Sequence, residues 1–193
     1  MGIFEGFGLI DLIFLILCLR ITYEAVSKGI FVEILKILAL FINSVFTFQF
    51  YSFLAEKIST KISFLSKDIV KAVTAIALFF IIGIIFGLLI KIIDALFKRK
   101  EILPSEKLLA IIFGFLRLAL LASVIVFFLY LFPAKPQFLS GYTSRIFKNV
   151  APKVYLMTAG IYSKFIPALA VNTEVKKIYE TKDDLSGNNQ NGD

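Results

Sequence analysis

The stretch from Ala72 to Ile90 holds nineteen consecutive residues without a charge, and Lys71 and Lys91 close it on either side. A helix of about twenty apolar residues crosses the hydrocarbon core of a bilayer. This stretch therefore predicts a transmembrane helix, and lipid is the solvent around much of the chain. In agreement, 59% of the 193 residues are hydrophobic, whereas an ordinary soluble domain is about 45–50% apolar.

Three further apolar stretches predict membrane spans, which makes four in all. They cover about residues 8–26, 34–53 and 108–132, and the turn Ser27-Lys28-Gly29 separates the first two. The first span is the weakest by hydropathy because it carries Asp11, Arg20 and Glu24. The predicted fold class is an all-α integral membrane protein with four transmembrane helices plus amphipathic C-terminal helices at the membrane surface.

The chain divides into three predicted regions: a four-helix transmembrane domain at 1–133, an amphipathic interfacial segment at 134–180, and a disordered polar tail at 181–193. In the second region apolar residues recur at helical spacing, Lys and Arg are interleaved with them, and Pro152 and Pro167 interrupt the pattern. Such a segment is too charged to span and suits helices that lie on the membrane. Residues 55–71 mix lysines with apolar residues and predict either a short helix lying on the membrane surface or a loop at the interface.

Residue usage argues against an enzyme. The chain has no histidine, and its one cysteine is Cys18, so zinc sites, Ser-His-Asp triads and an internal disulfide are not available. We expect a non-enzymatic protein without metal or cofactor. The net charge of +7 comes from basic residues that bracket apolar spans, a pattern that favours anionic lipid headgroups as partners and not nucleic acid.

Arg117 is the most informative single residue. It lies nine residues past Leu108, which places it roughly 13 Å into the fourth span at 1.5 Å per residue. A charge at that depth usually faces the bundle interior, a partner or water. Asp11 is a candidate counter-ion, although it can instead lie at the opposite interface. A buried structural pair and a polar patch that engages an ion, a lipid headgroup or a peptide both remain open.

Small residues one helical turn apart predict close helix packing. They are Gly83 and Gly87 on the third span, and Ala110 and Gly114 on the fourth. Such pairs let helices approach closely in lipid. We expect them to hold the bundle together, with a homo-oligomer interface as the alternative.

Two blocks of sequence resemble one known family. The first has an Ile10-Asp11 start and the turn Lys28-Gly29-Ile30-Phe31-Val32-Glu33. It is similar to the opening of the colicin V production protein (CvpA) family, which has an Ile-Asp start and a basic-Gly-Phe-x-x-Glu turn. Here the phenylalanine is displaced by one position.

The second block resembles that family's Asp-Arg-x-x-Gly-x-x-x-Gly-x-x-Arg-Gly motif. Gly114 and Arg117 match it. Three conservative replacements and one departure complete the comparison: Glu106, Lys107 and Ala110 stand for Asp, Arg and Gly, and Leu118 stands where the family has glycine. The resemblance covers about residues 8 to 133.

The resemblance implies a bacterial inner-membrane protein required for production or export of colicin V, a peptide toxin, and for envelope maintenance. Its implied partners are other envelope or export proteins, and no reaction is attached. Some relatives carry an extracytoplasmic protease after the fourth helix, which implies N- and C-termini outside the cytoplasm; the loop charges are nearly balanced. The alternative is a small membrane transporter or channel acting as an oligomer, with Arg117 lining a polar path.

Overall fold

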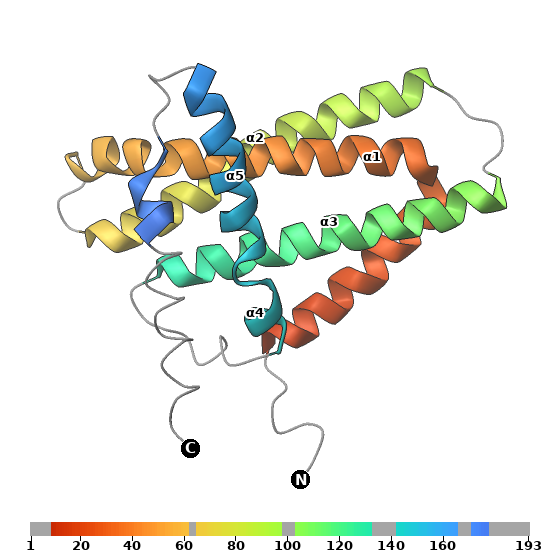
Figure 1. The fold of residues 1–193 in the computed structure, drawn as a ribbon, viewed down its shortest axis with the longest axis horizontal. Coiled ribbons are helices and arrows are strands. Elements are labelled where there is room, and N and C mark those ends of the chain that lie inside the picture. Colours follow the sequence, from red (N-terminus) through yellow and green to blue (C-terminus); the bar gives the residue numbers. More distant parts are fainter. Residues whose placement is uncertain (1–8, 62–64, 98–102, 133–141, 166–170, 178–193) are drawn as a thin grey trace, which may run out of the picture.

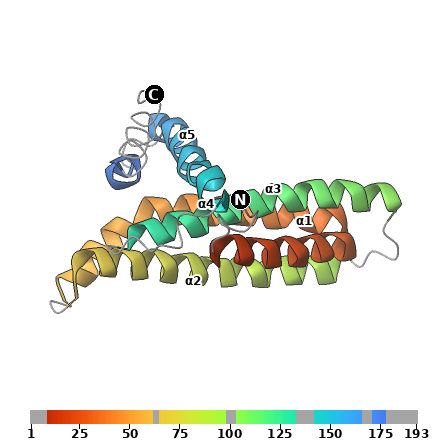
Figure 2. The ribbon, with the colours of Figure 1, turned by 90° about the horizontal axis from the view of Figure 1, so that it is seen from below.

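The computed structural model describes residues 9–61, 65–97, 103–132, 142–165 and 171–177. Every numbered element in these ranges is a helix: α1 (Leu9–Ser59), α2 (Lys67–Leu96), α3 (Pro104–Leu131), α4 (Tyr142–Phe147) and α5 (Val150–Phe165). The three long helices form a bundle, and α4 and α5 lie on one face of it, with α5 running across the long helices (Figures 1 and 2). The predicted disordered tail at 181–193 lies outside the described residues.

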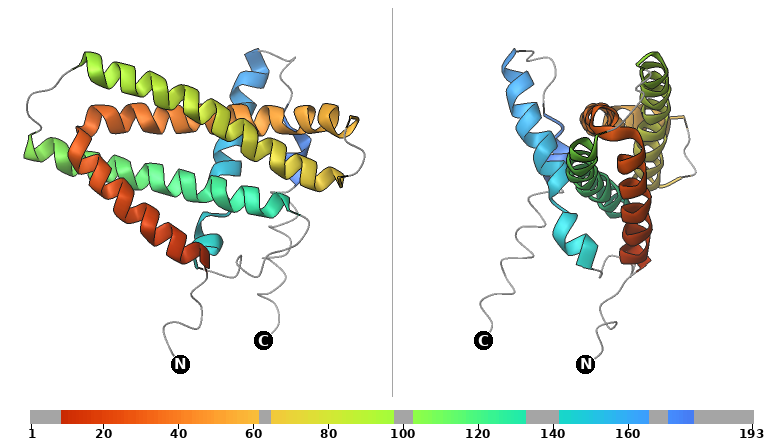
Figure 3. Two further views of the ribbon diagram at one scale, coloured as in Figure 1. Left: turned by 180° about the vertical axis from the view of Figure 1, so that it is seen from behind. Right: turned by 90° about the vertical axis from the view of Figure 1, so that its right-hand side faces the viewer.

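A sharp bend at Gly29 divides α1 into a first limb (residues 9–28) and a second limb (residues 30–59). Gly29 has φ 76° and ψ 174°, a backbone conformation that essentially only glycine adopts. From this bend the first limb, drawn in red, turns back towards the end of the bundle where α3 finishes (Figure 3). The first two predicted spans are therefore two limbs of one bent helix.

Three helices are long and apolar enough to cross a membrane, with candidate spans at Asp11–Ser59, Lys67–Leu96 and Pro104–Leu131. Only 11% of the apolar window of α2 is buried inside the protein. Large side chains of α2 such as Phe80, Ile84 and Leu88 are more than half exposed. Removing this much apolar surface from water is strongly favourable. In a membrane, lipid chains would cover it.

The predicted interface element at residues 55–71 is mostly part of the long helices. α1 continues to Ser59 and α2 begins at Lys67, so only residues 60–66 connect them. Lys57 extends α1 and stands 4.4 Å from the centre of the Phe53 ring. Residues 55–59 therefore lengthen the second limb, and residues 67–71 form the start of α2.

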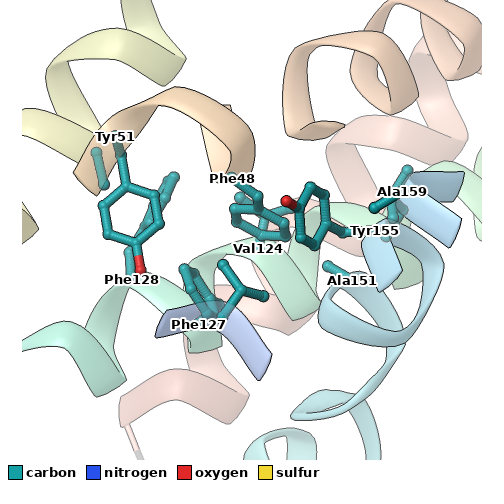
Figure 4. Close-up of a cluster of buried hydrophobic side chains, with 11 residues drawn as sticks. Phe48, Tyr51, Val124, Phe127, Phe128, Ala151, Tyr155 and Ala159 are labelled. Atoms are coloured by element: carbon teal, nitrogen blue, oxygen red, sulfur yellow. The ribbon is translucent and has the colours of Figure 1, made fainter. Parts of the chain in front are cut away.

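The core lies where the second limb, α3 and α5 meet (Figure 4). The Phe48 ring lies 4.4 Å from that of Phe127 and 5.8 Å, edge-on, from that of Tyr155. Ala151 and Ala159 complete the face of α5 that is buried there. The C-terminal segment thus shares one core with the bundle, while Met157 and other apolar side chains on its opposite face are exposed.

Hydrogen bonds also dock the C-terminal segment onto the second limb. The Tyr155 hydroxyl donates to Gln49 Oε1 at 2.7 Å and accepts from the Asn172 amide at 2.9 Å. The Asn172 side chain donates to the Phe48 carbonyl and to Ser52 Oγ. Burial raises the pKa of the Tyr155 hydroxyl above its ordinary value.

Candidate functional site

Four charged side chains form a closed ring beside the bend of α1. Lys36 Nζ lies 3.1 Å from Glu24 Oε1 and 2.9 Å from Glu33 Oε1. Arg117 Nη2 lies 3.3 Å from Glu24 Oε2, and its Nη1 lies 3.3 Å from Glu33 Oε2. Each cation therefore contacts both carboxylates. We call Glu24, Glu33, Lys36 and Arg117 the charge ring.

The bend explains how the ring assembles. Glu24 belongs to the first limb, whereas Glu33 and Lys36, which are three residues apart on one helix face, belong to the second limb. Gly29 turns the chain between them, so the two carboxylates face each other. The ring thus ties the two limbs of α1 together.

Close packing of α3 against the first limb brings in the guanidinium. A Cβ on Gly114 would lie only 3.2 Å from the Ala25 Cβ, so the absence of a side chain allows the approach. Arg117 is three residues further along α3 and reaches the ring. Ala110 is fully buried on the same helix.

Most of the ring is buried, so its charges depend on one another for compensation. The exposed fraction is 0% for the Glu33 side chain, 10% for Arg117, 13% for Lys36 and 39% for Glu24. A charge taken out of water costs several kcal/mol unless partners compensate it. Two carboxylates and two cations balance one another here. By hydrogen-bond geometry, however, Arg117 Nε is buried without an acceptor and Glu33 Oε2 is buried without a donor.

The ring lies inward from a second charged layer at the bend. Lys28 Nζ pairs with Asp94 Oδ2 at 3.2 Å, and both side chains are more than a third exposed. Glu33 and Lys36 follow Gly29 by four and seven residues, so they sit about 6–10 Å further along the second limb. Glu33 and Lys36 pair with each other within the ring.

A groove of about 320 Å³ opens beside the ring. Its walls come from both limbs of α1, from α2 and from α3. Polar groups at its lining are Arg20, Glu24, Lys36, Asn43 and Arg117, and the rest of the lining is apolar or glycine. Asn43 donates to the Phe79 carbonyl at 3.0 Å, which ties the second limb to α2 at the floor of this groove.

The two glycines of α2 line the groove, which corrects the packing role expected for Gly87. A Cβ on Gly87 would meet no atom within 4 Å, so no neighbouring helix approaches it. A Cβ on Gly83 would lie 3.3 Å from Asn43 Nδ2, so Gly83 does permit a close approach. Of this pair of small residues, Gly83 thus permits a close helix contact, whereas Gly87 borders open space.

The suggestion that Asp11 is the counter-ion of Arg117 is wrong. Arg117 pairs with Glu24 and Glu33. Asp11 lies thirteen residues before Glu24 on the same limb, about 20 Å away along the helix. There Asp11 Oδ1 accepts a hydrogen bond of 2.7 Å from the backbone amide of Thr143 in α4, at the opposite end from the bend.

Among the described residues, no three His, Cys, Asp or Glu side chains gather as a metal-binding group. The ring contains two carboxylates, and both already face cations.

The sequence profile described as Colicin V production protein matches residues 10–152. The chain belongs to the colicin V production protein family. This match includes the bend, the ring and the start of α5, so it runs further than the resemblance to residue 133 that the motifs indicated. No curated protein and no solved structure matches the chain. Membership in the family and the three long apolar helices make it a multi-pass membrane protein.

The two blocks that resemble the colicin V production family meet at the ring. Gly29 and Glu33 come from the first block, and Gly114 and Arg117 from the second. Glu106 and Lys107 lie instead in the first turn of α3, half-buried and exposed respectively. Leu118, the departure from the family motif, is buried to 2% exposure, so its side chain is accommodated in the packing.

Sequence reasoning missed two members of the ring. Glu24 was recognised only as a charge that weakens the first span, and Lys36 was not recognised as a neighbour of Glu24. The available signal was the pair of acids on either side of the Gly29 turn, because a reversal of the chain brings such flanking residues together.

Proposed function

We propose that this protein is a non-enzymatic bacterial inner-membrane protein that supports production or export of a colicin V-type peptide toxin and helps to maintain the envelope. The observation that carries this proposal is the family match over residues 10–152, joined to the meeting of both motif blocks at one buried ring. The protein acts by binding lipids or other envelope and export proteins, alone or as a homo-oligomer.

The ring suits a binding role better than a catalytic one. Its carboxylates are each held by two cations, and the lysine is held by two carboxylates, so none is an unpaired base or nucleophile. What the ring does supply is a rigid junction of three helical segments next to a groove. A partner that enters the groove would meet Arg117 and the exposed Arg20.

We further propose four membrane crossings, with both termini outside the cytoplasm. A straight helix over Asp11–Ser59 would be about 74 Å long, more than twice the roughly 30 Å hydrocarbon core. Divided at Gly29, the limbs are about 30 and 45 Å long and can each cross. Exposed Ile146, Met157 and Ile161 support contact of the C-terminal helices with the membrane surface.

Topology is testable with single cysteines in a Cys18→Ser background. A cysteine at Lys28 should be labelled from the cytoplasmic side, and one at Thr60 from the opposite side. Labelling of both from the same side would contradict the crossing of the second limb.

A toxin-production assay tests the function itself. In a colicin V-producing strain that lacks its own family member, the wild-type chain should restore the secreted toxin. Arg117→Leu should fail to do so, because Glu33 then loses a cation. Lys91→Leu is the matched control, since Lys91 is exposed and lies outside the groove lining. Normal toxin yield with Arg117→Leu at normal protein level would contradict the proposal.

The groove also favours a second candidate, a small transporter or channel acting as an oligomer. Three cations line it, and one of them, Arg117, lies midway along α3. Reconstitution in liposomes separates the two functions. Specific flux that Arg117→Leu abolishes while the fold stays intact would favour transport over partner binding.

A further inference from the structure

We propose that the groove beside the charge ring binds one anionic phospholipid, with the phosphate at Arg20 and Arg117 and an acyl chain along the apolar wall. This inference rests on the proposed function in so far as it names a ligand for the same site. It concerns a site within the bundle, apart from the general attraction of surface lysines to headgroups.

The charges of the groove call for an anion. Three cations, Arg20, Lys36 and Arg117, face two carboxylates, Glu24 and Glu33, so one positive charge is left over. In a medium of low dielectric constant an uncompensated charge is costly. An anionic headgroup would neutralise it.

Two guanidinium groups line the groove. Arg20 is exposed there and forms no ion pair within the described ranges. Arg117 is nine-tenths buried and adds positive charge to the same lining, while its Nη atoms face Glu24 and Glu33. Guanidinium groups bind phosphate oxygens well because their donors match its geometry.

The walls of the groove identify the rest of the ligand. Leu17 and Ile21 of the first limb line it together with Phe86 and Ile90 of α2. Gly87 leaves the wall open, since no atom lies within 4 Å of where its Cβ would be. A free phosphate ion would leave this apolar surface uncovered, whereas a phospholipid covers it with an acyl chain. The site also lies within apolar helices, where lipid is the abundant anion carrier.

The test is native mass spectrometry of the purified full chain in detergent, with equimolar phosphatidylglycerol and phosphatidylcholine of identical acyl chains. Wild type should retain phosphatidylglycerol in preference. Arg20→Leu should lower that preference about fivefold, as expected for one basic residue at an anionic lipid. Lys91→Leu, which removes an exposed cation outside the lining, should leave it unchanged.

A second variant removes the space and keeps the charges. Gly87→Leu places a side chain in open space and should abolish retention of the lipid without lowering thermal stability. Gly160→Leu is the matched control, because a Cβ on this exposed α5 glycine also meets nothing within 4 Å. It should bind lipid as the wild type does.

Several results would overturn the inference. One is an equal loss of phosphatidylglycerol preference with Lys91→Leu and Arg20→Leu, and another is unchanged lipid retention with Gly87→Leu. Displacement of phosphatidylglycerol by millimolar inorganic phosphate would also do so. So would a wild-type dimer that Gly87→Leu dissociates into monomers. Each would leave the proposed function standing, because no toxin is measured. Conversely, normal toxin yield with Arg117→Leu would contradict the proposed function and leave the lipid result intact.

Discussion

Replacing Arg117 by methionine removes the guanidinium that joins α3 to both limbs of α1. Glu33, whose side chain is fully buried, then keeps Lys36 as its cation, and the ring carries one excess negative charge. Breaking a buried ion pair by removal of one partner costs about 3–5 kcal/mol of folding free energy. We expect Arg117→Met to lose stability in this range, and Glu33→Leu to do likewise because it leaves an excess positive charge.

The double variant Glu33→Leu with Arg117→Met should be more stable than either single variant. It retains the Glu24–Lys36 pair, whose atoms lie 3.1 Å apart, and it restores neutrality with apolar side chains of similar size. Replacing a buried ion pair by packed apolar residues is often neutral or stabilising. We therefore expect the double variant to exceed each single variant by at least about 2 kcal/mol, because the single variants leave an uncompensated charge and the double variant does not.

The assay is equilibrium unfolding by sodium dodecyl sulfate in non-ionic micelles, followed by circular dichroism. Lys91→Met serves as the control, because this lysine is exposed and should change the unfolding free energy by no more than about 0.5 kcal/mol. If the double variant is as destabilised as the sum of its two single variants, the four charges do not act as a unit, and the argument fails.

Two other features of the fold give separate predictions. Gly29→Ala should cost about 1–3 kcal/mol of unfolding free energy, because its φ of 76° and ψ of 174° disfavour any Cβ. Gly160→Ala is the control and should be neutral or stabilising, because Gly160 lies in a helix with open space around it. Equal effects of the two substitutions on the unfolding free energy would contradict this prediction. Tyr155→Phe should cost about 1–3 kcal/mol, since Gln49 loses a donor and the Asn172 amide loses its acceptor. Hydrogen exchange in α5 should rise in that variant, and unchanged exchange would show that these bonds do not hold the segment.

The long helices were predictable because apolar length is a property of each segment alone. The run from Ala72 to Ile90 lies entirely within α2, and the predicted fourth span coincides with most of α3. The separate surface helix expected within residues 55–71 was wrong, because α1 runs on to Ser59 and α2 begins at Lys67. Lysines near a helix end give the same sequence pattern whether the helix continues or lies flat.

The partners of Arg117 were not predictable, because they depend on relations between helices. Which residues of two helices lie at the same depth depends on how far the helices are shifted along each other and on the direction of the bend at Gly29. Asp11 and Glu24 are both acids of the first limb, and only the folded chain shows that Glu24 stands at the level of Arg117. In the same way, spacing alone did not distinguish Gly114, which meets Ala25, from Gly87, which meets open space.

The charge ring itself is an argument for binding. Stability would be served as well by apolar side chains at these positions, because a buried ion pair seldom improves on good packing. A ring that holds only the bend would also need no further cation, whereas Arg20 adds a positive charge at the groove. The exposed charge of Arg20 makes sense if an anion occupies the groove. If the fully apolar replacement of Glu33 and Arg117 proved stable yet lost retention of phosphatidylglycerol, the ring would be needed for binding and dispensable for the fold.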